Sequence, residues 1–316
     1  MNPKDRANIE TQDRLTKTTP PMDLDVARQL LLESKEIMDH LGVRFFLRQG
    51  TCLGAVRDNA FISWDDDLDL GIILGDNGLH EQSIEPLLAA FRESDYFVQT
   101  ESSDSMIYAS LLKHGIRIDL MFHRVINQQI YHWPGIWLPV TLFDQLKEIH
   151  FIGETFFVPN PPEKYLSIKY GPDWQTPKQL NYAKDVVDNI PLEHVPGFLE
   201  KITRSVAGFL HPVNTARLRV LNDSGLPIHG ANVRVVGVGN YKTNKQGYAK
   251  LYLETKGLYS STGSGTSDVG SIYAIVISYG NHQEVLYEEI LAPTESYVYK
   301  PEPEQTEGRI FVLSKQ

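Results

Sequence analysis

Residues 64–70 read Trp-Asp-Asp-Asp-Leu-Asp-Leu and hold four carboxylates in an apolar frame. Apolar residues bound the run on both sides, from Phe61 to Trp64 and from Leu68 to Leu74. A run of Asp is most often a solvated loop, but a solvated loop rarely has such flanks, which are typical of a buried strand. The pattern therefore predicts a strand with acids at its entrance, held at the edge of a core.

Crowded carboxylates repel one another, so such a cluster usually holds a divalent cation or shares a proton. With the leucines on one side of the strand, Asp67 and Asp69 both face the other side. Asp119 lies between apolar neighbours in a second expected strand, 116–122, where a carboxylate is unfavourable without a role. Together the three predict a site for Mg²⁺ or Mn²⁺, metals that also accept phosphate oxygens and assist phosphoryl transfer.

A turn just upstream supplies candidate groups for the phosphate itself. Backbone N–H groups of Gly50 and Thr51, at the start of a short expected helix, can cradle an anion. Arg48, Arg57 and Lys113 are the nearest basic residues in sequence that can balance the remaining charge. For each of the three, a solvated surface position is an equally good interpretation.

Composition narrows the class of protein. The 316 residues suggest about two domains, and the single cysteine, Cys52, excludes an internal disulfide framework, which fits a reducing compartment. The net charge of -10 argues against a nucleic-acid partner. No apolar run approaches the ~18 residues of a transmembrane segment, and the polar N-terminus is unlike a secretory signal. We therefore expect a cytoplasmic protein.

Patterning along the chain predicts four segments. Residues 1–20 lack apolar periodicity and read as a flexible tail. Residues 21–195 mix expected helices and strands, and 196–215 form an amphipathic helix or linker, which packs on its own domain or contacts the inner membrane face peripherally. Residues 216–316 change to short strands separated by turn residues, which predicts a β-sandwich.

Four motifs together resemble the signature of the LicD family. They are FLRQGTCLGAVR at 46–57, FISWDDDLD at 61–69, RIDL at 117–120 and KYGPDW at 169–174. That family includes bacterial phosphocholine transferases and fukutin-related pentitol-phosphate transferases, within the nucleotidyltransferase superfamily. The similarity extends over roughly residues 24–190.

The resemblance implies an α+β nucleotidyltransferase-like domain with a mixed sheet over residues 21–195. It implies that Asp67 and Asp69 are the metal-binding pair and Asp119 the third catalytic acid. Asp65 falls on a recurring acidic position, either as general base toward the acceptor hydroxyl or as an outer metal ligand. Asp66 occupies a variable position.

Two residues depart from the family pattern. Gln49 stands where a small residue or Glu is common, and Cys52 where Leu or Ser is more common. A nucleophilic role for Cys52 is disfavoured, because no partner base can be assigned and phosphoryl transfer here needs no covalent step.

The C-terminal residues 216–316 resemble carboxypeptidase-regulatory-like and transthyretin-like domains, which are immunoglobulin-like or prealbumin-like sandwiches. Residues 220–233 and 243–249 carry that similarity, and their glycines serve turns. No catalytic constellation is visible in this region. The resemblance implies an accessory module for glycans, partners or orientation.

The leading hypothesis is a metal-dependent phosphotransferase that moves a phospho-alcohol (phosphocholine, glycerol phosphate or ribitol phosphate) from a CDP-activated donor. The acceptor is a sugar hydroxyl of a surface polysaccharide, a lipid-linked precursor or a glycoconjugate. Tyr131, Trp133 and Trp137 either stack on a sugar, base or quaternary ammonium or belong to the core. Two alternatives are a nucleotidyltransferase that moves a nucleotide onto a small alcohol, and a non-catalytic glycan-binding protein that acts through the sandwich.

Overall fold

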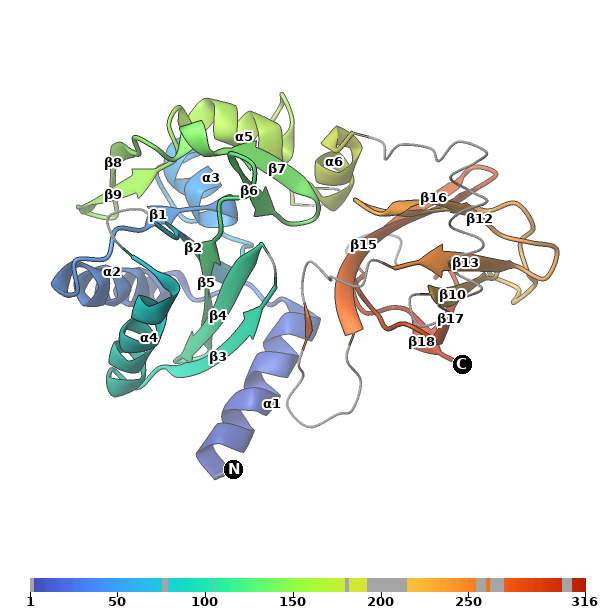
Figure 1. Cartoon of the computed structure of the whole chain (residues 1–316), viewed down its shortest axis with the longest axis horizontal. Helices are drawn as coiled ribbons and strands as arrows, with labels where there is room; N and C mark the ends of the chain where they lie inside the picture. The colour runs from blue at the N-terminus through green and yellow to red at the C-terminus, as the bar shows by residue number, and fades with distance from the viewer. Residues whose placement is uncertain are drawn as a thin grey trace. The chain divides into compact units, whose positions relative to one another are not determined.

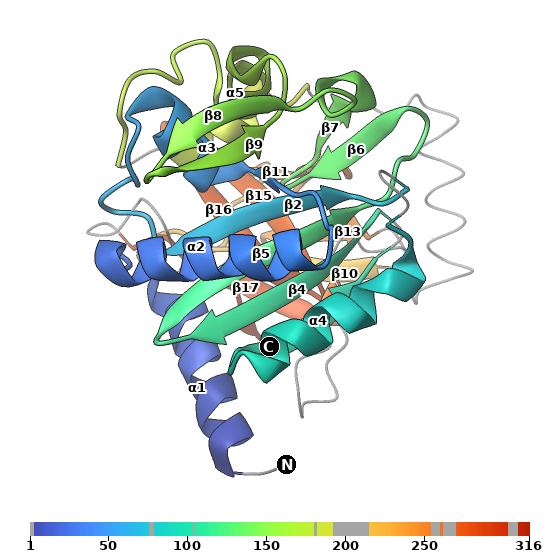
Figure 2. The same cartoon turned by 90° about the vertical axis from the view of Figure 1, so that its left-hand side faces the viewer.

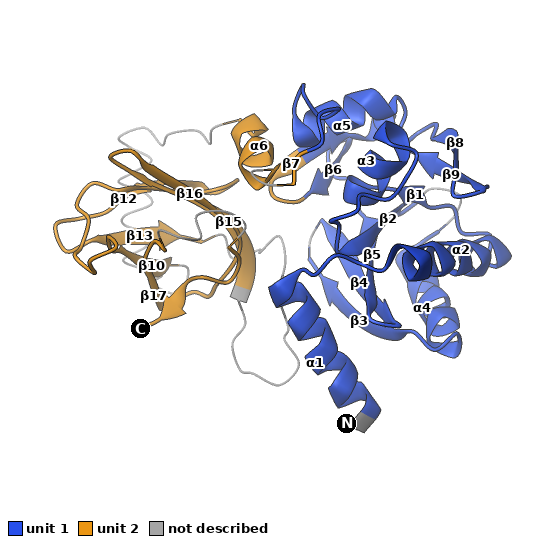
Figure 3. Cartoon of the chain, turned by 180° about the vertical axis from the view of Figure 1, so that it is seen from behind, with its two compact units in different colours: residues 1–132, 137–177 blue, residues 133–136, 178–316 orange. Residues whose placement is uncertain are grey.

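The structure is a computed structural model in which the chain divides into two compact units (Figure 3), residues 1–132 with 137–177 and residues 133–136 with 178–316. The sequence placed the corresponding boundary at residue 195. The amphipathic helix expected at 196–215 lies outside the described residues, except for Thr215. The structure describes residues 3–75, 79–103, 105–179, 182–191, 215–253, 260–261, 270–302 and 309–316.

A five-stranded mixed sheet is the centre of the first unit, with strand order β1-β2-β5-β4-β3 (Figure 1). Strand β2 runs parallel to β5, and the other neighbouring pairs are antiparallel. Every residue of β2 is buried, as its apolar frame predicts. The strands are β1 (Phe46–Leu47), β2 (Asp67–Ile73), β3 (Phe97–Ser102), β4 (Met106–Lys113) and β5 (Ile116–His123).

Helices α2 (Leu24–His40) and α4 (Ile84–Glu93) lie over one face of this sheet (Figure 2). Asp23 caps α2, because its carboxylate accepts hydrogen bonds from the N–H groups of the second and third residues that follow, at 3.0 and 3.1 Å. Helix α3 (Gln49–Arg57) follows β1 directly and packs on α5 (Pro162–Tyr170). Two hairpins complete the connections, formed by β6 (Gln129–His132) with β7 (Ile136–Pro139) and by β8 (Lys147–Phe151) with β9 (Glu154–Val158).

The N-terminal segment corrects one expectation. Residues expected as a flexible tail instead form helix α1 (Pro3–Thr18). Gln12 and Leu15 are buried, and the Thr16 hydroxyl accepts a hydrogen bond from Arg117 of β5 at 3.1 Å. Since most of α1 is polar and exposed, it has no apolar stripe from which a helix is predicted.

The described residues of the second unit form two β-sheets and helix α6 (Tyr182–Asn189). One sheet has the order β13-β10-β17-β18, and the other has β12-β11-β15-β14 with β16 paired to β15. Buried residues from both sheets form one hydrophobic core, so the unit is an all-β two-sheet domain. The strands are β10 (Thr215–Val220), β11 (Asn232–Val235), β12 (Gly239–Lys242), β13 (Tyr248–Tyr252), β14 (Ser260–Ser261), β15 (Gly270–Tyr279), β16 (His282–Leu291), β17 (Ser296–Tyr299) and β18 (Ser314–Lys315).

The C-terminal residues contribute one short strand to the second unit. Among the residues described after 302, the only strand is β18. Phe311 has a φ of +51°, in the left-handed region, which interrupts an extended segment.

Among the described helices of the chain, none combines the length and apolarity that crossing a membrane requires.

Candidate active site

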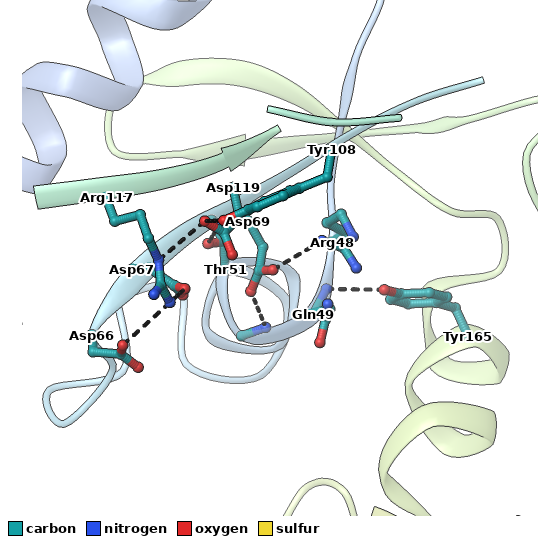
Figure 4. Close-up of polar contacts among 11 residues, drawn as sticks. Arg48, Gln49, Thr51, Asp66, Asp67, Asp69, Tyr108, Arg117, Asp119 and Tyr165 are labelled. Carbon is teal, nitrogen blue, oxygen red and sulfur yellow. Dashed lines mark hydrogen bonds and ion pairs between the residues drawn. The ribbon is translucent and has the colours of Figure 1, made fainter. Parts of the chain in front are cut away.

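Parallel pairing of β2 with β5 assembles an acidic cluster. In this register Asp67 lies opposite Arg117, and Asp69 lies opposite Asp119. Paired residues of neighbouring strands point to the same face of a sheet, and the period of two puts all four side chains on one face. Figure 4 shows them converging in front of α3. The structure thus brings together the three acids that the sequence singled out as metal ligands.

Arg117 lies at the centre of this cluster. Its Nε lies 3.1 Å from Asp119 Oδ1, and its Nη2 lies 3.4 Å from Asp66 Oδ2. The same Nη2 donates to Asp67 Oδ2. The Tyr108 hydroxyl of β4 donates to Asp119 Oδ1 at 2.8 Å from the other side. Burial, followed by the charge of Asp119, raises the pKa of Tyr108, so this hydroxyl remains a donor.

Arg48 and the first turn of α3 surround Asp69. Arg48 Nη1 lies 3.2 Å from Asp69 Oδ1, and the Gly50 N–H donates to Asp69 Oδ2 at 3.1 Å. The backbone N–H of Asp69 donates in turn to the Thr51 hydroxyl at 2.8 Å. Arg48, Gly50 and Thr51 were predicted to contact phosphate, but here the Gly50 amide and the Thr51 hydroxyl hold Asp69 in place.

Helix α3 begins at Gln49, one residue before Gly50. Gln49 has a φ of +41°, a conformation that is unfavourable for a residue with a side chain. Its N–H donates to the hydroxyl of Tyr165, a fully buried residue of α5, at 2.9 Å. Tyr165 therefore fixes the first residue of α3, and through it the position of the Gly50 amide.

Gly50 and Asp65 approach too closely for any side chain at position 50. A Cβ on Gly50 would lie 2.3 Å from Asp65 Oδ2. Within the described part of the chain, that oxygen is buried and has no hydrogen-bond partner. A buried carboxylate oxygen is costly in that condition, and such an atom points to a ligand that is not part of the chain.

Burial and mutual repulsion shift the protonation of these acids. Burial, followed by the charge of Asp67, raises the pKa of both Asp65 and Asp69 well above the ordinary range. Burial raises the pKa of Asp119 to about 6, although Arg117 opposes the shift. Burial, assisted by Arg48, lowers the pKa of Lys169 to about 7. The cluster therefore favours added positive charge, from protons or from a cation.

The residues present fit a divalent cation. Carboxylate oxygens of Asp65, Asp66 and Asp67 lie within 4.8 Å of one another, which is compatible with ligand distances of about 2–2.6 Å. Asp65, the residue with the unpartnered Oδ2, belongs to this group. Asp65 and Asp66 thereby join Asp67 as candidate ligands, whereas among the described residues Asp69 and Asp119 do not fall in a group of this spacing.

Two predicted basic residues lie elsewhere. Arg57, near the C-terminal end of α3, binds Asp58 through three contacts of 2.7 to 3.0 Å. Lys113 donates to Glu33 at 2.6 Å and to the carbonyl of Ser94 at 2.9 Å. Both were selected for nearness in sequence alone, and both form ion pairs with carboxylates outside the cluster of Asp65 to Asp69 and Asp119.

Sequence reasoning gave no role to Arg117, Tyr108, Tyr165 or Lys169. Arg117 was within reach of prediction, because it precedes Asp119 by two residues and so shares its face of β5. Lys169 lies in the KYGPDW motif and is 1% exposed, close enough to Arg48 and Asp69 for their charges to affect it. Tyr108 and Tyr165 reach the site only through tertiary packing, which leaves no local pattern.

Cys52 and the aromatic group have structural positions. Cys52 is fully buried, and burial raises the pKa of its thiol, which disfavours a thiolate nucleophile. Tyr131 and Trp133 are buried, so they belong to the core. Trp137 is 41% exposed and packs edge-on against Tyr131, with ring centroids 5.4 Å apart, and it alone of the three offers an accessible ring.

A mixed sheet that gathers carboxylates from two adjacent strands, beside a glycine that opens a short helix, defines a nucleotidyltransferase-like domain. Residues 42–161 match the family described as LicD/FKTN/FKRP, nucleotidyltransferase domain. The matched residues are less than half of the chain, and they include Asp65 to Asp69 and Asp119.

Several curated proteins are similar to part of this chain. The ribitol 5-phosphate transferase FKRP of Mus musculus is 27% identical over 165 residues, which is 49% of this chain and 33% of that protein. An uncharacterized protein of Rickettsia typhi is 40% identical over 150 residues, which is 46% of this chain and 45% of that protein. The ribitol-5-phosphate transferase FKTN of Mus musculus is 27% identical over 48% of this chain. The chain spans about a third of the length of the FKRP and FKTN relatives.

One solved structure is similar over part of the chain. It is an antigenic nucleotidyltransferase-like protein from Paracoccidioides brasiliensis, 15% identical, covering 60% of this chain and 90% of that one with a TM-score of 0.34.

Proposed function

We propose that this protein is a metal-dependent phosphotransferase that moves a phospho-alcohol from a CDP-activated donor to a sugar hydroxyl. The observation that carries the proposal is the group formed by Asp65, Asp66 and Asp67, whose carboxylates crowd together while one buried oxygen has no hydrogen-bond partner among the described residues. A purely structural cluster would be neutralised within the chain. This one favours a cation, on a domain whose relatives include ribitol 5-phosphate transferases.

In this proposal the closely spaced Asp65, Asp66 and Asp67 hold Mg²⁺ or Mn²⁺. Asp69 and Asp119, which the sequence predicts as ligands together with Asp67, complete the acidic site on the same face of the sheet. The bound ion supplies charge stabilisation to the phosphoryl group during transfer. Asp65 alternatively accepts the proton of the sugar hydroxyl, a role that its raised pKa supports.

The basic residues have separate tasks. Arg48 is 1% exposed and holds Asp69 in place, so we assign it to positioning rather than to direct phosphate contact. Lys169 adds positive charge near the same carboxylate from α5. The donor's phosphates require cations that can reach them, and Arg117, at 13% side-chain exposure, is the accessible candidate.

Among the three donor alcohols, ribitol is favoured because the FKRP and FKTN relatives are ribitol 5-phosphate transferases. Choline and glycerol are the alternatives. The accessible ring of Trp137 is suited to stacking on a sugar of the acceptor. The acceptor is a polysaccharide, a lipid-linked precursor or a glycoconjugate. A cytoplasmic location, with or without peripheral contact with the inner membrane face, is part of the proposal.

The second unit has an accessory role in this proposal. Its two sheets share one core, an architecture consistent with the resemblance to prealbumin-like domains. Its buried glutamates are bound by groups of the same unit. We therefore assign the chemistry to the first unit and glycan or partner binding to the second.

The test is to incubate the full-length protein with Mg²⁺ or Mn²⁺ and each of CDP-ribitol, CDP-glycerol and CDP-choline, and to measure the release of CMP. We expect one donor to be consumed, chelation to stop the reaction, and Asp67→Asn to lower the rate by roughly 10²- to 10³-fold. Asp58→Asn, which removes one charge from a carboxylate paired with Arg57, is the matched control and retains activity.

Other products would select the alternatives. Pyrophosphate release from a nucleoside triphosphate, with attachment of the nucleotide to an alcohol, would establish the nucleotidyltransferase instead. Glycan binding that survives Asp67→Asn, with no turnover of any nucleotide, would establish the non-catalytic protein.

A further inference from the structure

Arg117 binds several side chains at once, whereas a simple structural ion pair has one partner. Its guanidinium bridges the two strands that carry the acids, since it binds both Asp67 Oδ2 and Asp119 Oδ1. It also reaches Asp66 and donates to the Thr16 hydroxyl of α1. Three different carboxylates therefore share one guanidinium, as Figure 4 shows for the side chains on the sheet.

The oxygens that Arg117 binds belong to candidate metal ligands. Asp66 and Asp67 are members of the closely spaced carboxylate group, and Asp119 is the third acid of the proposed site. A carboxylate oxygen that binds a guanidinium closely cannot also coordinate a metal ion fully, so the two cations compete. A divalent ion carries twice the charge of the guanidinium and interacts correspondingly more strongly with the same oxygens.

Arg48 does not fit this description. It is 1% exposed, and the carboxylate to which it is ion-paired, Asp69, is held by Gly50 and Thr51 as well. Arg117 has 13% of its side chain exposed, and Asp67 and Asp119 have 12% and 19%. The guanidinium and its partners therefore have a path to solvent, whereas Arg48 has almost none.

We propose that Arg117 is a displaceable counter-ion: it holds the acids of β2 and β5 together, yields them to a divalent cation, and then binds a phosphate of the donor. Arg117 is in this sense a positioning residue for the metal and a specificity residue for anionic donors. The phosphate half rests on the proposed function, and the metal half does not.

Arginine is better suited to this task than lysine. Its planar fork binds two carboxylates at once and then a phosphate in the same geometry, whereas the lysine ammonium is a single point charge. A lysine at this position keeps the charge but loses the bridge between strands.

The experiment compares the full-length wild type with Arg117→Gln, Arg117→Lys and the control Arg92→Gln, which removes an arginine from an exposed pair with Glu85. The Mn²⁺ dissociation constant is measured by electron paramagnetic resonance of free Mn²⁺ in the absence of donor. Melting temperatures are measured with EDTA and with Mn²⁺, and KM and kcat are measured with the CDP-alcohol that is turned over.

We expect Arg117→Gln to melt at a lower temperature than wild type in EDTA and to bind Mn²⁺ more tightly, by roughly tenfold. Its KM for the donor should rise more than its kcat falls. Arg117→Lys should lie between the two, and Arg92→Gln should match the wild type. A structural arginine would give the opposite metal result, because loss of its support would weaken Mn²⁺ binding.

Unchanged or weaker Mn²⁺ binding in both Arg117 variants would overturn the proposal, as would an absence of Mn²⁺ binding to wild type. If Arg117→Gln does not fold in EDTA, the comparison is made with Arg117→Lys, which keeps the charge. Tighter Mn²⁺ binding without turnover of any CDP-alcohol would support the metal half and refute the proposed function.

Discussion

Buried carboxylates occur in both units of this molecule, and their surroundings differ. In the second unit, Glu284 of β16 is 2% exposed and receives the guanidinium of Arg309 at 2.7 Å and the hydroxyl of Tyr299. The His282 Nε2 lies 2.6 Å from that same hydroxyl. Glu289, also on β16, accepts the backbone N–H groups of residues 312 and 313 at 2.7 and 3.1 Å.

In the first unit, the acids outnumber the cations that reach them. Arg117 is shared among three carboxylates, and Asp65 Oδ2 has no partner among the described residues. In the second unit, Glu284 is paired with Arg309, and both carboxylate oxygens of Glu289 accept a backbone N–H. The difference teaches that burial of an acid does not indicate function, whereas uncompensated charge among buried acids does.

The largest expected effect separates activity from stability in the acidic cluster. Asp67→Asn should lower the transfer rate by roughly 10²- to 10³-fold, the scale for loss of a group that stabilises transition-state charge. Its melting temperature should change little, because the loss of the ion pair with Arg117 is offset by the removal of a charge that is unfavourable to both Asp65 and Asp69. A large fall in melting temperature would place this cluster in the same structural class as the glutamates of β16.

Gly50→Ala tests the close approach behind that cluster. The new Cβ would meet Asp65 Oδ2, so Asp65 must move, and a displacement near 1 Å can lower a rate by about 10²-fold. Gly42→Ala is the control, because a Cβ there meets nothing within 4 Å and its φ of +66° costs stability only. Steady-state kinetics with thermal melting should show an activity loss for the first variant alone.

Glu284→Gln tests the compensated cluster. The change leaves the charge of Arg309 partly uncompensated, with 8% of its side chain exposed, and should lower the free energy of unfolding by about 3 kcal/mol. Transfer activity per folded molecule should be unchanged. Denaturant unfolding and kinetics measured on the same preparation decide this, and lost activity without lost stability would contradict our assignment of the chemistry to the first unit.

The smallest effect concerns pH. Burial raises the pKa of Glu289 to about 7, despite two backbone hydrogen bonds that oppose the shift. The folded protein therefore holds this proton more tightly than the unfolded chain, so the stabilisation is present at low pH and is lost as the pH rises through about 7. Glu289→Gln cannot lose a proton, and its unfolding free energy should fall less than that of wild type between pH 5 and 8. Parallel pH profiles would refute this.

The acidic strand was predictable because two local patterns coincide there. The apolar frame of residues 61–74 predicted a buried strand, and the period of two placed Asp67 and Asp69 on one face. Strands β4 and β5 also agree with their apolar runs to within one residue. The same reasoning, applied to Arg117 and Asp119, would have found the central guanidinium.

Other parts of the site depend on contacts between distant segments. Tyr165 reaches Gln49 from α5, and Thr16 reaches Arg117 from a helix that lacks an apolar stripe. Nearness in sequence suggested Arg57 and Lys113, but each binds a carboxylate outside the cluster. Arg57 binds Asp58, and Lys113 binds Glu33. Long-range packing leaves no periodic pattern, so these residues were beyond sequence reasoning.

The parallel pairing of β2 with β5 also has a consequence for the order in which this unit folds. Arg117 and Asp67 are separated by 50 residues, and parallel neighbours cannot pair through a tight hairpin. Helix α4 and the β3–β4 hairpin fall in that interval and depend on more local contacts, so we expect them to form before the strands meet. In a partly folded chain, Asp67 and Asp69 of β2 are therefore still apart from Asp119 of β5. We expect catalytic activity to appear only once the whole domain has folded.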